Sequence, residues 1–152
     1  MQKALSEAAA RSPKALSVTV GFSEPLAHLI EAGADGFLMP SRFEPCGLNQ
    51  MYSQAYGTPP VVGGVGGLVD SVVDATADPA NGTGFVMRSQ DAEGFADAIT
   101  RLRATWKQPT LWRRMQMNGM ARPFGWEASA RRYVEVYQQA IERARPKFFS
   151  TP

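Results

Sequence analysis

The chain of 152 residues is long enough for one compact domain but not for two, and its 44% of hydrophobic residues can build a core. A formal net charge of +2 is too small to indicate nucleic-acid binding, and no apolar run approaches the roughly 20 residues that a membrane span needs. The single cysteine excludes an internal disulfide and fits a reducing compartment. We therefore expect a cytoplasmic protein that binds neither nucleic acid nor membrane.

The first part of the chain predicts short strands that alternate with helices. The alanine-rich stretch 1–11 is typical of a helix, and the β-rich run 16–20 predicts a first strand. Ser23 is a suitable cap for a helix that ends at Gly33, and the apolar run 37–39 predicts a buried strand. The same reasoning predicts, in chain order, a helix at 48–56, a strand at 60–62, a glycine-rich loop at 63–67, a helical turn at 68–73 and a strand at 84–87.

Three amphipathic helices follow. The second of them opens near Pro109 and closes at 118–119. The apolar positions of the first and third helices are spaced by three or four residues and are Phe95, Ile99, Leu102 and Trp106, then Trp126, Ala130, Tyr133, Val134, Tyr137 and Ile141. We expect these stripes to form part of the core.

The alternation of strands and helices indicates an α/β fold with a parallel sheet covered by helices. The chain opens on a helix and offers about four strands, whereas a typical sheet has about five or six. We therefore predict a partial Rossmann-like parallel sheet flanked by helices, which is the later part of a larger α/β domain.

The most informative segment is 40–52, which reads Pro-Ser-Arg-Phe-Glu-Pro-Cys-Gly-Leu-Asn-Gln-Met-Tyr. It places a single carboxylate, Glu44, and Gly47 between the end of a predicted strand and the start of a helix. Such a junction directs free backbone N–H groups and the positive end of a helix dipole into one crevice. Anionic and hydroxyl-rich ligands bind at this place in open α/β sheets.

Several motifs in a fixed order carry a family resemblance. They are 21–24 (Gly-Phe-Ser-Glu), 34–35 (Ala-Asp), 40–50, 56–58 (Tyr-Gly-Thr), 66–68 (Gly-Gly-Leu), 81–85 (Asn-Gly-Thr-Gly-Phe) and Trp126. Together they resemble the carboxyl-terminal portion of bacterial glycogen synthases and plant starch synthases, which are retaining GT-B glucosyltransferases that use ADP-glucose. The resemblance covers residues 16 to about 137, and the Phe-Glu-Pro-Cys-Gly-Leu stretch at 43–48 is its most specific part.

This resemblance implies how the chain is organised and which reaction it serves. Residues 1–125 correspond to part of a nucleotide-sugar-binding Rossmann-like domain, 126–145 to the carboxyl-terminal helix that braces the amino-terminal GT-B domain, and 146–152 to a tail. The implied reaction transfers glucose from ADP-glucose to the 4-OH end of an α-1,4-glucan with retention, without a metal or another cofactor. We expect the amino-terminal domain, and the Arg and Lys that clamp the pyrophosphate in the family, to be missing from this chain.

Two alternatives stay open. The first is a truncated, non-catalytic fragment that binds adenine nucleotide. It is favoured by the stretch 63–65, which reads Gly-Gly-Val where the family usually has an Arg and a Thr near the sugar and phosphate. The second is a GT-B transferase with a different donor. Tyr52 argues against it, because related nucleotide-sugar transferases carry a second Glu at this position.

The resemblance assigns the catalytic role to Glu44. In the family the matching Glu hydrogen-bonds the donor glucose and stabilises positive charge as the glycosidic bond loosens, and a preorganised anion lowers that barrier. The plain alternative is a surface carboxylate beside a turn. Because Glu44 and Phe22 each follow a predicted parallel strand, we expect both to lie at the same edge of the sheet.

The nucleotide-sugar-binding residues implied by the resemblance are Phe22, Cys46, Gly47, Leu48, Asn49, Gly66 and Gly67. Residues 46–49 act mainly through backbone N–H groups on sugar hydroxyls and pyrophosphate, and Asn49 stands where the family most often has Thr. Cys46 is equally well explained as a small buried filler. Phe22 either stacks on adenine, an interaction worth about 1–3 kcal/mol, or lies in the core. The lone histidine, His28, is expected to be structural.

Overall fold

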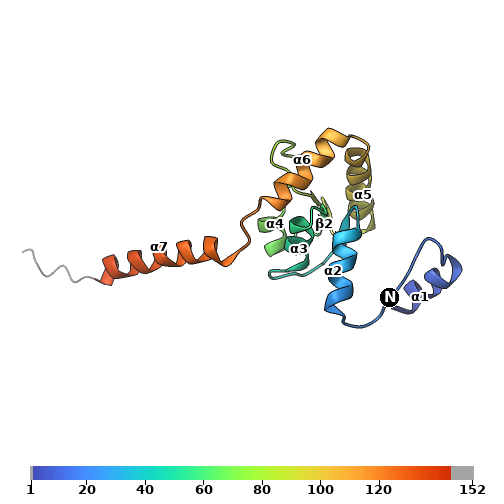
Figure 1. Ribbon diagram of the computed structural model, residues 1–152, viewed down its shortest axis with the longest axis horizontal. Coiled ribbons are helices and arrows are strands. Elements are labelled where there is room, and N and C mark those ends of the chain that lie inside the picture. The colour runs from blue at the N-terminus through green and yellow to red at the C-terminus, as the bar shows by residue number, and fades with distance from the viewer. Residues whose placement is uncertain (1, 145–152) are drawn as a thin grey trace, which may run out of the picture.

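The computed structural model describes residues 2–144 (Figure 1). The elements in this range are, in chain order, α1 (Gln2–Arg11), α2 (Glu24–Gly33), β1 (Phe37–Met39), α3 (Asn49–Ala55), β2 (Pro60–Val62), α4 (Gly67–Ser71), β3 (Phe85–Val86), α5 (Ala92–Trp106), α6 (Pro109–Met120) and α7 (Trp126–Ala144). The predicted helices are therefore all present, within a few residues of their expected bounds. The predicted end of the last helix at 145 and the tail 146–152 lie outside the described residues. None of the described helices is long and apolar enough to span a membrane.

The sheet is parallel, with the strand order β1-β2-β3. Between β1 and β2, Phe37 pairs with Pro60 and Met39 pairs with Val62. Between β2 and β3, Val61 pairs with Phe85. The predicted strands at 37–39 and 60–62 are confirmed, and β3 lies within the predicted 84–87. Because all three strands run the same way, the loops that follow them leave the sheet at one edge.

The predicted strand at 16–20 is wrong. The structure places no strand between α1 and α2, and β1 forms the edge of the sheet on that side. Val20 in this segment is exposed. The β propensity of a segment describes how its side chains fit a half-buried sheet surface, but a strand also needs a neighbour that pairs its N–H and C=O groups. In the described part of the chain no strand pairs with 16–20, and the segment is irregular.

The core lies on both faces of β2. Val61 and Val62 are fully buried, and adjacent strand residues point to opposite faces of a sheet. On one face Val61 belongs to a cluster with side chains of β3, the residue after it, α5 and α6, namely Phe85, Met87, Ala98, Trp112 and Met115. On the other face Val62 packs with Leu68 and Val72, from α4 and the residue after it. Of the stripe predicted for α5, Phe95 and Leu102 pack against the first cluster as expected, whereas Trp106 is exposed and its assignment to the core is wrong.

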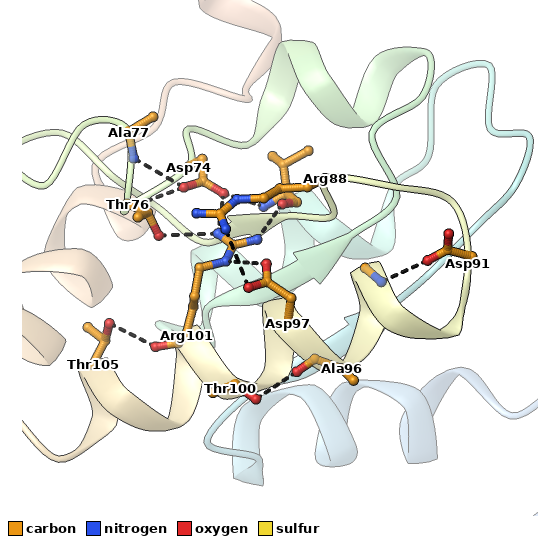
Figure 2. Close-up of polar contacts among 12 residues, drawn as sticks. Asp74, Thr76, Ala77, Arg88, Asp91, Ala96, Asp97, Thr100, Arg101 and Thr105 are labelled. Atoms are coloured by element: carbon orange, nitrogen blue, oxygen red, sulfur yellow. Dashed lines mark hydrogen bonds and ion pairs between the residues drawn. The ribbon is translucent and has the colours of Figure 1, made fainter.

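A partly buried ion-pair network fixes the loop before β3 to helix α5 (Figure 2). Arg101 donates from Nη1 to Asp74 Oδ2 at 2.8 Å, from Nε to Asp97 Oδ2 at 2.9 Å, and from Nη2 to the carbonyl of Val86 at 2.7 Å. Asp74 also accepts from the N–H groups of Val86 and Thr76, each at 2.8 Å. Burial alone raises the pKa of Asp74, but the Val86 N–H and the Arg101 guanidinium outweigh it and hold this pKa below its ordinary value.

The prediction that the stripe on α7 forms core is wrong. Trp126 is 82% exposed and Tyr137 is 61% exposed, and no residue of this helix is buried. Figure 1 shows α7 extending away from the sheet and the other helices. An amphipathic pattern identifies an apolar face, but it does not identify the surface that covers it. Within residues 2–144 nothing covers this face.

Candidate functional site

Two loops meet at the carboxyl edge of the sheet. The β1 loop (residues 40–48) follows β1 and carries Glu44, and the β2 loop (residues 63–66) follows β2 and carries the glycine run. The N–H of Gly63 donates to the carbonyl of Met39 at 3.1 Å, and the N–H of Gly67 donates to the carbonyl of Pro45 at 3.2 Å. Helices α3 and α4 begin directly after these loops, so both helices start at this edge.

The two loops fit backbone against backbone because the β2 loop has no side chains at its points of contact. A Cβ atom on Gly66 would lie 1.9 Å from the carbonyl oxygen of Glu44, and one on Gly67 would lie 2.6 Å from that of Cys46. Gly66 also has φ +47°, in the region that favours glycine. The family resemblance assigns Gly66 and Gly67 to nucleotide-sugar binding, which stays a prediction. In the structure both glycines lie against the backbone of the β1 loop.

A buried polar cluster, formed by Gln50, Gln54 and Ser71, lies beneath the loops. The Gln50 amide donates to the carbonyls of Cys46 and Gly47 and to Ser71 Oγ, each at 3.1 Å. Gln54 donates to the Gln50 carbonyl at 2.9 Å and to the Ser71 carbonyl at 3.2 Å. Sequence reasoning missed this cluster. The signal in the sequence was the spacing of four between two glutamines, which places them on one face of α3. In the structure the buried residues of α3 are all polar.

The structure brings most of the predicted site residues together. Glu44 is partly buried in the β1 loop, where its carbonyl touches Gly66. Cys46, Leu48 and Asn49 are exposed beside it. The interpretation of Cys46 as a buried filler is therefore wrong. Whether Glu44, residues 46–49, Gly66 and Gly67 bind a nucleotide sugar stays a prediction.

Cys46 and Leu48 also line an open cavity of about 770 Å³ between α3 and the start of α7. Tyr52 and Ala55 line it from α3, and Arg122, Phe124 and Trp126 line it from the segment that leads into α7. The loop face that carries Cys46 is therefore accessible to a ligand of the size of a nucleotide or a sugar.

Phe22 is not brought into the site. Its side chain is 95% exposed, and the strand that was expected to place it at the sheet edge is absent. The interpretation of Phe22 as a core residue is therefore wrong, and its stacking on adenine stays a prediction. His28 joins α2 to α3, because its Nδ1 lies 3.0 Å from Tyr56 Oη and its ring lies 5.7 Å from that of Tyr52. These contacts agree with the structural role expected for it.

The chemistry available at this edge is that of one carboxylate among many backbone groups. Glu44 can accept hydrogen bonds from hydroxyl groups and stabilise nearby positive charge. Gly63 and Gly64 add no charge at the start of the β2 loop.

Comparison with known proteins places the chain among sugar transferases. Residues 3–118 match the family of glycosyl transferases group 1. The glycogen synthase of Paracidovorax citrulli is 59% identical over 148 residues, which are 97% of this chain and 29% of that protein. The glycogen synthase of Nitrosospira multiformis is 51% identical over 148 residues, covering 95% of this chain and 30% of that protein. The chain thus spans about 30% of the length of these curated relatives.

A solved structure agrees with these matches. The catalytic domain of starch synthase IV from Arabidopsis thaliana, described as bound to ADP and acarbose, superimposes with a TM-score of 0.80 at 32% identity over 92% of this chain and 30% of that chain. The expected fold, a partial Rossmann-like parallel sheet flanked by helices as in GT-B glycosyltransferases, is confirmed, and so is the resemblance to glycogen and starch synthases. The chain belongs to the glycosyl transferases group 1 family.

Proposed function

We propose that this chain is the carboxyl-terminal, donor-binding portion of a glycogen synthase, which transfers glucose from ADP-glucose to the 4-OH end of an α-1,4-glucan with retention. The observation that carries the proposal is the meeting of the β1 loop, which carries Glu44, and the β2 loop at one edge of the sheet. The identity of 59% to a glycogen synthase and the ADP described in the related starch synthase support the choice of reaction and of nucleotide.

In this proposal each part of the site has a separate task. The Glu44 carboxylate accepts hydrogen bonds from the donor glucose and stabilises positive charge as the bond to the leaving ADP breaks. Residues 46–49 and Gly66 offer backbone N–H groups to the sugar hydroxyls and the pyrophosphate. Phe22, exposed and without a packing partner among the described residues, is free to stack on adenine. No other cofactor is needed.

The chain by itself is not expected to elongate glucan. A transferase must hold donor and acceptor together, and much of its acceleration comes from that positioning. The exposed stripe on α7 is the surface that the amino-terminal domain would cover, and that domain is the proposed partner. Without that domain, we expect the chain to behave as the alternative describes, namely as a nucleotide-binding fragment without catalytic activity. A cytoplasmic location belongs to the same proposal, because the exposed Cys46 thiol suits a reducing compartment.

Calorimetric titration of the purified chain with ADP-glucose, UDP-glucose and ADP tests the proposal. We expect ADP-glucose and ADP to bind and UDP-glucose to bind more weakly. Glu44→Gln should weaken the binding of ADP-glucose but leave that of ADP unchanged, because Glu44 is assigned to the glucose. Binding of UDP-glucose alone, or equal loss of both adenine ligands in Glu44→Gln, would contradict the assignment.

A second assay separates binding from catalysis. The chain is incubated with ADP-glucose and glycogen, and released ADP and labelled glucan are measured. We expect no glucan synthesis above background. Turnover within about tenfold of a full-length synthase would show that the chain needs no partner domain.

A further inference from the structure

We propose that Gln50 is a positioning residue that holds the β1 loop and the β2 loop in one fixed arrangement. The inference depends on the proposed function only for what the loops bind. The fixed arrangement itself follows from the hydrogen bonds of a single buried amide, which join the β1 loop to Ser71 on α4, the helix that begins where the β2 loop ends.

The hydrogen bonds of Gln50 reach the β1 loop directly and, through Ser71, the start of α4 that directly follows the β2 loop. Its side chain is completely buried, and its Nε2 donates to the carbonyls of Cys46 and Gly47 in the β1 loop. The same Nε2 donates to Ser71 Oγ on α4, and that hydroxyl donates in turn to the carbonyl of Gly67 at 2.7 Å. A continuous chain of hydrogen bonds therefore runs from the β1 loop to the residue that follows the β2 loop.

Gln50 also supports the backbone conformation of Gly47. Gly47 has φ +74°, and a Cβ atom there would lie 2.5 Å from Gln50 Oε1. The bond from Nε2 holds the carbonyl of Gly47, and this carbonyl fixes the direction in which the chain enters α3. A shift of Gln50 would therefore change both the turn at Gly47 and its distance from Gly67.

The hydrogen-bond partners of Gln50 show that its side-chain amide does more than fill space in the core. Its Oε1 is buried and has no hydrogen-bond partner in the described part of the chain. A buried unpaired acceptor is unfavourable, and an apolar side chain of similar shape would avoid it. The donor group of the amide explains why a glutamine is present here, because three acceptors converge on Nε2.

Gln54 provides a matched control on the same helix. It is also buried, and its Oε1 is also unpaired among the residues described. Its Nε2 donates to the carbonyls of Gln50 and Ser71, and to neither loop. Gln50→Met and Gln54→Met thus remove the same group from similar surroundings, but only the first removes a bond to the β1 loop.

Hydrogen–deuterium exchange of the ligand-free chain tests the inference. We expect Gln50→Met to speed exchange at 46–49 and 66–68 by about tenfold, while Gln54→Met leaves these two segments as in the wild type. Ser71→Ala is a second, smaller change, and it should loosen 66–68 even if Gln50→Met does not fold. Equal and uniform acceleration along the chain in both methionine variants would show that Gln50 is an ordinary buried residue and overturn the proposal.

Titration with ADP-glucose measures a second quantity, the Kd, which a substitution at a merely structural residue would leave unchanged. Below the unfolding midpoints of both variants, we expect Gln50→Met to raise the Kd by at least about fivefold and Gln54→Met to leave the Kd unchanged. An unchanged Kd in Gln50→Met would overturn the positioning role at the site. If the wild-type chain binds no ADP-glucose, the proposed function fails, whereas the exchange experiment still decides whether Gln50 joins the loops.

Discussion

The loops at the carboxyl edge of the sheet and helix α7 both stand out in the sequence, yet only the loops find partners within the described residues. The β1 loop and the β2 loop touch through backbone atoms, and the contact is so close that it leaves no space for a side chain in place of the glycines. Helix α7 has a clear apolar stripe, and that stripe is exposed along its length.

The difference lies in what each pattern specifies. A glycine at a close contact and an amide with three acceptors each determine a particular partner in the same fold. An amphipathic stripe determines only that an apolar surface is needed. The central part of the chain is therefore expected to be sensitive to single substitutions, and α7 to be tolerant of them. The following experiments test this contrast.

The largest effect is expected at Arg101, whose side chain is only 12% exposed. Arg101→Met leaves Asp74 partly buried without its cation, and breaking a buried pair in this way typically costs about 3 kcal/mol or more. Arg88→Met is the control, because Arg88 is 64% exposed and lies 3.4 Å from Asp97. It should change the free energy of unfolding by less than about 1 kcal/mol. Urea denaturation of both variants measures the difference, and equal losses would contradict the assignment of Arg101 to the core of the fold.

A smaller but still large effect is expected in the β2 loop. Gly66→Ala places a Cβ atom against the carbonyl of Glu44 and forces alanine into a backbone region with positive φ, a strain of about 1–3 kcal/mol before the contact is counted. Gly125→Ala is the control, because nothing lies within 4 Å of a Cβ atom there. Thermal unfolding of the two variants should separate them clearly. A stable Gly66→Ala variant would show that the loops can move apart.

The stability of the central part should also depend on pH through Asp74. The pKa of Asp74 is lowered in the folded chain from its ordinary value of 3.8, despite the opposing effect of burial. The ionised carboxylate therefore stabilises the fold at pH above about 3.8, and this contribution is lost as the pH falls through the lower folded pKa. We expect the difference in unfolding free energy between wild type and Asp74→Asn to be constant near neutral pH and to shrink in acid. Urea unfolding from about pH 7 to about pH 2.5 measures it. A difference that stays constant into the acid range would contradict the lowered pKa.

The sequence predicted local features well and long-range pairing poorly. The strands at 37–39 and 60–62 were predictable because short apolar runs stand between turn signals. The segment 16–20 is also rich in apolar and β-branched residues, but it lacks a neighbouring strand, which no local pattern reveals.

The same division holds at the candidate site. Glu44 was found because an unusual motif surrounds it. Gln50 was missed because its role depends on Ser71, a residue 21 positions away that faces it only in the folded chain. Arg101 and Asp74 are 27 positions apart, and their pairing was likewise not visible in the spacing of charges.

The smallest effect is expected on α7. Ile141 is 58% exposed, and serine has nearly the same helix propensity as isoleucine, so Ile141→Ser tests packing rather than helix formation. We expect the free energy of unfolding to change by less than about 0.5 kcal/mol. Met115→Ala, in the core on α6, is the contrasting variant and should cost about 2–5 kcal/mol. If Ile141→Ser costs more than about 1 kcal/mol, the stripe on α7 is covered in solution, and repeating the measurement at several protein concentrations then shows whether a second copy of the chain covers it.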